Sequence, residues 1–104
     1  MLVSGTNFAA AGFEDGAAAY QRGDYDTALR EWRPLAERGN QQAQYNIGYM
    51  HFNGIGVPKE PAQATRWFAM AAEQGDPAAQ MSLGVMYGTG QGVPQDYTQA
   101  YIWL

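Results

Sequence analysis

The chain has 104 residues, of which 46% are apolar and 13% aromatic, and its formal net charge is −4. This composition suits the core of one domain and excludes a disordered chain, which is poor in aromatic side chains. Six basic residues without a cluster argue against binding to a phosphate backbone, so no nucleic acid partner is expected. The absence of cysteine excludes disulfides, thiolate metal sites and a cysteine nucleophile.

The first twelve residues, MLVSGTNFAAAG, are expected to form an N-terminal tail. The segment lacks a basic region at its start, and polar residues interrupt its apolar ones, so it is a poor signal peptide. No apolar run in the chain approaches the ~20 residues that a membrane-spanning helix requires. We therefore expect no insertion into a membrane, and the sequence itself leaves the compartment open.

Helix signals recur along the rest of the chain. Short polar residues that can cap a helix precede the first helical residue at Asp24, Asn40, Asp76 and Asp96. Glu60 followed by Pro61 marks a further start with a weaker cap. The expected helices span residues 25–38, 41–52, 61–74 and 77–87, with one before Gly23 and one from Tyr97. No segment alternates between apolar and polar residues, so we predict an all-α fold.

The second half of the chain repeats with a period of 36 residues. Residues 43–68 and 79–104 are identical at eleven of 26 positions, which indicates a repeat architecture. A shorter copy lies upstream, where Trp32 precedes Phe68 by the same 36 residues. We divide the chain into a tail at 1–12, a short repeat at 13–39, a full repeat at 40–75 and an incomplete repeat at 76–104. Glycine recurs in the middle of a helix at Gly48 and Gly84, which predicts that the paired helix approaches too closely for a Cβ.

Two glycine-rich loops, NGIGVPKE at 53–60 and TGQGVPQD at 89–96, belong to this repeat. Such loops often bind phosphate, but neither contains the third glycine of a dinucleotide site or the Gly-Lys-Ser/Thr of a P-loop. We predict instead that each loop connects the first helix of a pair to the second, with glycines at positive φ and a valine packed inward. No cofactor is expected.

Together these motifs resemble the Sel1-like repeat, a relative of the tetratricopeptide repeat. The resemblance rests on Ala-x-x-x-[Ile/Leu]-Gly-x-x-[aromatic], Gly-x-Gly-Val-Pro, Ala-x-x-Trp and Ala-Ala-x-x-Gly, as they stand in residues 43–75 and 79–103. Residues 13–39 are closer to a plain tetratricopeptide unit. The resemblance implies an α-solenoid of antiparallel helix pairs, with about two and a half repeats and roughly six helices. It also implies a binding scaffold without catalysis, and favours a bacterial periplasmic or secreted location over a cytoplasmic one.

Catalytic and metal-binding residues are not evident in the sequence. His51 is the only histidine, and it replaces the aromatic residue that Tyr87 supplies in the next repeat. A single imidazole without cysteine partners is a weak ligand set, so we expect a partly packed helix residue and no metal site. Ser4 and Ser82 are the only serines, and neither lies in a nucleophile-elbow sequence. We therefore do not expect an enzyme.

The resemblance implies that the first helix of each pair lines the concave side of the solenoid. Three positions per helix, counted from Gly48 and its equivalents, are then expected to face a groove. These candidate partner-binding residues are Phe13, Ala17 and Tyr20, then Tyr45, Tyr49 and Phe52, then Met81, Val85 and Gly88, with Asn46, Asn53 and Ser82 nearby. Aromatic anchors beside polar groups suit the capture of an extended or helical peptide. A protein or peptide partner is therefore predicted, and the alternative is that several of these side chains only form the core between repeats.

The last expected helix stops at Leu104, about half-way through its repeat. Trp103 and the face of the helix at 77–87 would then lack the cover of a following repeat. Either the natural chain continues, or this end packs on another chain and the module self-associates. A further alternative is a cell-envelope accessory protein or enzyme, because some relatives have been linked to cell-wall processes.

Overall fold

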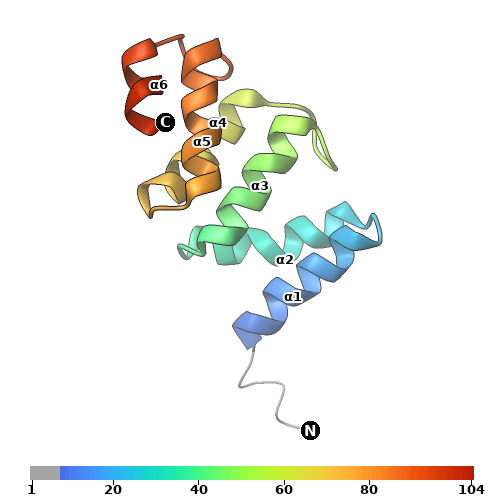
Figure 1. Ribbon diagram of the computed structural model, residues 1–104. Coiled ribbons are helices and arrows are strands. Elements are labelled where there is room, and N and C mark those ends of the chain that lie inside the picture. Colours follow the sequence, from blue (N-terminus) through green and yellow to red (C-terminus); the bar gives the residue numbers. More distant parts are fainter. Residues whose placement is uncertain (1–7) are drawn as a thin grey trace, which may run out of the picture.

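The computed structural model describes residues 8–104, and within this range the chain forms six helices and no strand. The helices are α1 (Phe8–Gln21), α2 (Tyr25–Glu37), α3 (Gln41–Asn53), α4 (Pro61–Glu73), α5 (Pro77–Thr89) and α6 (Tyr97–Trp103). Each helix packs mainly on its neighbours in sequence, which gives three antiparallel pairs stacked in a row (Figure 1). The resulting body measures 54 × 26 × 17 Å. The predicted all-α solenoid is confirmed, and none of the helices described is long and apolar enough to cross a membrane.

Short polar side chains start the helices at the predicted residues. The side chains of four N-cap residues each accept a hydrogen bond from the backbone N–H three residues later, at 2.9–3.3 Å: Asp24, Asn40, Asp76 and Asp96. Glu60 makes no such bond, and Pro61 begins α4 with the fixed φ of a first helical residue. The starts of α2 to α6 therefore fall on the predicted residues, whereas the ends of α2 to α5 differ by one or two.

The first helix begins earlier than expected, at Phe8 and not at residue 13. Residues 8–12 are thus part of α1, while residues 1–7 lie outside the described part of the chain, and the division into a tail and repeats stays a prediction. Three alanines follow Phe8, and alanine has the strongest intrinsic preference for the helix. The repeat alignment missed this turn because its match to the next repeat starts only at Phe13.

One contact recurs inside each helix pair, between a glycine of the first helix and a large side chain of the second helix or, in the third pair, of the residue that follows it. Gly16 faces Trp32, Gly48 faces Phe68 and Gly84 faces Leu104. A Cβ added to Gly48 would lie 2.8 Å from the Phe68 ring, which is closer than real Cβ contacts come. The predicted close approach is confirmed, and it explains why a residue that costs about 1 kcal/mol relative to alanine is found inside these helices.

The core consists of two clusters, one at each junction between successive helix pairs. The largest buried side chains of the first are Trp32, Ile47 and Met50, and those of the second are Phe68, Leu83 and Met86. In a solenoid of this kind, stability is the sum of repeat terms and nearest-neighbour junctions. A defect in one cluster therefore weakens one junction of the stack.

The tryptophan of each of the last two helix pairs packs against a core cluster. Trp67 packs against the first cluster and Trp103 against the second. Trp103 is half-buried in this way, and the expectation that it and the face of α5 lack the cover of a following repeat stays a prediction. The exposed large side chains of α6 and the residue after it are Tyr97, Tyr101, Ile102 and Leu104. Self-association through this face stays a prediction.

Each of the two glycine-rich loops connects the two helices of a pair and also contacts the preceding repeat. Gly54 and Gly56 have φ values of 68° and 75°, and their counterparts at 90 and 92 have 74° and 76°, so the predicted turns are confirmed. A Cβ on Gly56 would overlap Tyr25, the first residue of α2, and a Cβ on Gly92 would overlap the carbonyl group of Pro61, the first residue of α4. The second glycine of each loop thus lies against the preceding repeat, where no side chain fits.

Candidate functional site

Three adjoining hollows lie along the first helices of the pairs, with volumes of about 320, 280 and 190 Å³. Tyr45 lines all three hollows, Tyr49 lines the first two, and Asn46 lines the first and the third. We call these three adjoining hollows, which share residues of α3, the groove. Side chains of all three helix pairs contribute to it.

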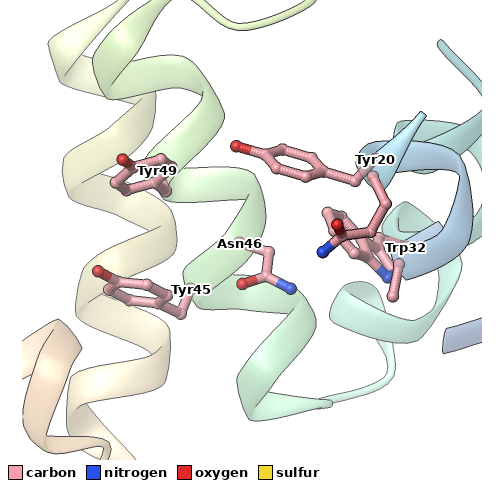
Figure 2. A pocket seen from close by; sticks show the side chains of 7 residues that line it. Tyr20, Trp32, Tyr45, Asn46 and Tyr49 are labelled. Carbon is pink, nitrogen blue, oxygen red and sulfur yellow. The ribbon is translucent and has the colours of Figure 1, made fainter. Parts of the chain in front are cut away.

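The first hollow lies between α1 and α3, with Trp32 of α2 at its base. The Trp32 ring lies 5.8 Å from that of Tyr20, and its indole N–H donates a hydrogen bond of 3.1 Å to the Phe13 carbonyl, which fixes the ring. Figure 2 shows the Tyr20 ring extending from α1 toward α3. On α3, the rings of Tyr45 and Tyr49 lie 6.3 Å apart, one helical turn from each other. The hollow is thus lined by two pairs of aromatic rings.

The second hollow occupies the equivalent position one repeat later, and its chemistry differs. Phe68 of α4 stands where Trp32 does, with its ring 5.4 Å from that of Tyr45. The residues Tyr45, Asn46 and Tyr49 of the first hollow correspond to Met81, Ser82 and Val85 of the second. Both hollows have aromatic rings, because Tyr45 and Tyr49 line both of them, but the second adds flexible and aliphatic side chains on α5.

All eight residues that were predicted to bind a partner line the groove. They are Phe13, Tyr20, Tyr45, Asn46, Tyr49, Phe52, Met81 and Val85. Gly88, the last expected groove position on α5, does not line the groove and faces α6, where an added Cβ would lie 3.6 Å from that of Ala100. Several groove residues also pack against the core, Phe13 and Tyr20 on the first cluster and Tyr45 and Phe52 on the second. That these side chains bind a partner stays a prediction.

The base of the groove was missed by the sequence reasoning. Trp32 and Phe68 come from second helices, whereas candidates were sought only on first helices. A usable signal was present, because the two residues are 36 apart and each packs on the mid-helix glycine of its own pair. A large side chain that packs on such a glycine occupies the space on the first helix where a Cβ would otherwise be.

The groove carries almost no charge. No ionisable acid or base other than tyrosine lines the first two hollows. Asp76, in the third, already accepts hydrogen bonds from the Ala79 N–H at 2.9 Å and the Gln41 amide at 3.2 Å. Burial, together with the nearby Tyr49 and Tyr25, raises the pKa of Tyr20, so this hydroxyl stays protonated at neutral pH.

Several polar groups of the groove are not used by the fold. Among the hydrogen bonds of residues 12–104, none involves the hydroxyls of Tyr20, Tyr45, Tyr49 and Ser82 or the side-chain amides of Gln21, Gln42 and Asn46. Each of these groups can donate a hydrogen bond as well as accept one. The groove therefore offers donors without offering charge.

His51 lies on α3 but does not line the groove, and it is 7% exposed. Its Nδ1 lies 3.7 Å from Oε1 of Glu60 and has no hydrogen-bond partner among the residues described. Burial lowers the pKa of the imidazole, the Glu60 charge opposes this effect, and Arg33 adds to it. Over the described range, no group of three histidine or carboxylate side chains could hold a metal ion. His51 is best described as a neutral, packed side chain.

Acidification is expected to destabilise the protein through His51. The folded-state pKa lies below the unfolded value of about 6.5, so the unfolded chain binds more protons below that pH, and the free energy of unfolding falls as pH is lowered. His51→Gln should lose less stability than the natural protein between pH 7 and pH 5, as measured by urea denaturation. Asp24, whose pKa is lowered by hydrogen bonding with Thr27, titrates below this window. Equal losses in both proteins would contradict the assignment.

Comparison with known proteins identifies the repeat. The family model described as Sel1 repeat matches residues 41–76 and 77–104. A protective antigen present in uropathogenic Escherichia coli strains, displaying an SLR fold, is 34% identical with a TM-score of 0.86, and the match covers 96% of this chain and 22% of the antigen. A Sel1 repeat protein from Oxalobacter formigenes is 35% identical with a TM-score of 0.83, and the match covers 96% of this chain and 78% of that one. The chain thus spans less than a quarter of the length of the antigen.

These matches bear on both fold and function. Sel1 repeat proteins generally act as protein-interaction modules and are usually non-enzymatic. Residues 13–39 lie outside the matched segments, and their assignment as a short repeat stays a prediction. The two matched segments make up more than half of the chain. By its sequence and its fold, the chain belongs to the Sel1 repeat family.

Proposed function

We propose that this chain is a protein-interaction module that binds a peptide segment of a partner protein in the groove. The observation that supports this function is that three adjoining hollows share Tyr45 and are lined by side chains from all three helix pairs. Concave, mostly apolar sites with a few polar groups are where proteins hold ligands. A groove that crosses successive repeats suits an elongated ligand better than a compact one.

The anchors for such a segment are the exposed apolar side chains of the groove. Tyr49 is 43% exposed, Val85 45% and Met81 63%, so a ligand can still bury much of their surface. Tyrosine is enriched among the residues that contribute most to binding energy, and methionine adapts its shape to different partners. The amides and hydroxyls beside them would fix the register of the bound segment.

Tyr49→Ala is expected to weaken partner binding by about 30-fold or more, which corresponds to about 2 kcal/mol for the loss of an aromatic anchor. Tyr49 is the most suitable position because its ring is exposed, whereas the Tyr45 ring packs on the buried Phe68, so that Tyr45→Ala would also disturb the core. Partners are first captured from a lysate of the native host with the natural chain, and the affinity of the purified pair is then measured by calorimetry.

Tyr101→Ala is the matched control, because Tyr101 is 86% exposed on α6 and does not line the groove. It should bind the partner as the natural chain does. Unchanged affinity in Tyr49→Ala, or an equal loss in Tyr101→Ala, would show that the groove is not the binding site. Circular dichroism of both variants verifies that the helices are intact.

A further inference from the structure

We propose that the occupant of the groove is an uncharged, proline-rich segment in the polyproline II conformation. This inference rests on the proposed function and specifies the chemistry of the bound peptide. It follows from three properties of the lining: its lack of charge, its unused hydrogen-bond donors and its paired aromatic rings.

The charge of the lining selects against ionised peptides. The first two hollows contain no acidic or basic side chain that could pair with a charged residue of the ligand. The Asp76 carboxylate in the third hollow already accepts two hydrogen bonds. A charged side chain buried here would lose its hydration without gaining a counter-ion, which is costly. The net charge of −4 disfavours acidic segments further.

The hydrogen-bond groups of the lining select for free carbonyls. Within residues 8–104 the groove is built from helices, whose backbone groups are paired internally, so no sheet edge can receive a peptide strand. The available donors are the hydroxyls of Tyr20, Tyr45, Tyr49 and Ser82 and the amides of Gln21, Gln42 and Asn46. A bound helix would bury these donors while its own carbonyls stay paired, and unpaired buried donors are costly. A polyproline II segment has no internal hydrogen bonds, so its carbonyls can accept from the donors.

The aromatic rings provide surfaces for proline. In the first hollow, Tyr20 and Trp32 form one pair at 5.8 Å and Tyr45 and Tyr49 another at 6.3 Å (Figure 2). Proline-rich segments dock in grooves lined by aromatic side chains, and their preformed conformation loses little entropy on binding. The apolar second hollow, which includes Met81, can receive a further proline or an aliphatic side chain. All three properties agree on the same ligand.

The experiment titrates the isotope-labelled full chain with short peptides blocked at both ends, followed by NMR. Nonaproline should shift the amide signals of α1 and α3 and bind at least tenfold more tightly than a Gly-Ser peptide of equal length. A nonaproline with three glutamate replacements should bind as weakly as the Gly-Ser peptide. Tyr49→Phe keeps the ring and removes one donor, so it should bind nonaproline about two- to tenfold more weakly, and Tyr101→Phe should bind it normally.

Two further probes separate this proposal from other occupants. A neutral amphipathic helical peptide of Leu, Ala and Gln that binds with the same Tyr49 dependence, while nonaproline does not, would overturn the polyproline assignment and leave the groove as a peptide site. Binding of chitohexaose in place of nonaproline would overturn it in favour of a glycan. Absence of binding by every probe would also reject it, and the partner capture with Tyr49→Ala would then judge the proposed function separately.

Discussion

Phe68→Ala is expected to lower the free energy of unfolding by about 3–5 kcal/mol, the usual cost of removing a buried phenyl ring. Phe68 is 2% exposed, and its ring lies 5.4 Å from that of Tyr45 and 6.5 Å from that of Phe52. It packs on Gly48 within its own pair and belongs to the cluster that joins the second pair to the third. Urea denaturation followed by circular dichroism measures the loss, and a value below about 1 kcal/mol would contradict the packing described.

A second replacement at Gly48 tests the contact itself. In the natural chain, Gly48→Ala should destabilise by about 1–3 kcal/mol, because its Cβ would lie 2.8 Å from a ring that cannot move aside. In the Phe68→Ala background the space is open, so the same change should stabilise by up to about 1 kcal/mol through helix propensity. Gly12→Ala is the matched control, because its Cβ would meet its nearest neighbour at 3.7 Å. The effect of Gly12→Ala on the free energy of unfolding should have the same sign in the natural chain and in the Phe68→Ala background.

Gly92→Ala is expected to destabilise by about 2–5 kcal/mol, the combined cost of a left-handed backbone and of overpacking. Gly92 has a φ of 76°, and its Cβ would overlap the carbonyl group of Pro61 at the start of α4. A backbone group at the start of a packed helix cannot rotate away as a side chain can. The loop would have to leave the preceding repeat, which weakens the junction between the second and third pairs.

Gly23→Ala supplies the comparison for this loop. Gly23 has a similar φ of 82°, but nothing lies within 4 Å of the position where its Cβ would be. Its replacement should cost only the backbone strain, about 1–2 kcal/mol. Thermal and urea denaturation of both variants measure the difference. An equal loss of unfolding free energy at the two positions would mean that Gly92 is needed only for its backbone conformation. The contact of this loop with the preceding repeat would then not contribute to stability.

The sequence by itself determined the helices and their repeat. Caps such as Asn40 and Asp76 bond to a backbone N–H only three residues away, so the information about each helix start is local and readable. The period of 36 residues then related Gly48 to Gly84 and located the close approach within each pair. The positions of Tyr45 and Tyr49 on the groove were implied by the family resemblance, applied to the helical phase of that glycine.

Only the tertiary structure decided how successive pairs meet. The base of the groove comes from Trp32 and Phe68 of the second helices, and Trp103 packs against the second cluster, which contains side chains of α4 and α5. The contact of Gly92 with Pro61 joins residues 31 positions apart in two different repeats. These contacts depend on the angle and distance at which pairs stack, which arise from the summed packing of many side chains. No local pattern encodes such a sum, and that is why the base of the groove became visible only in the folded chain.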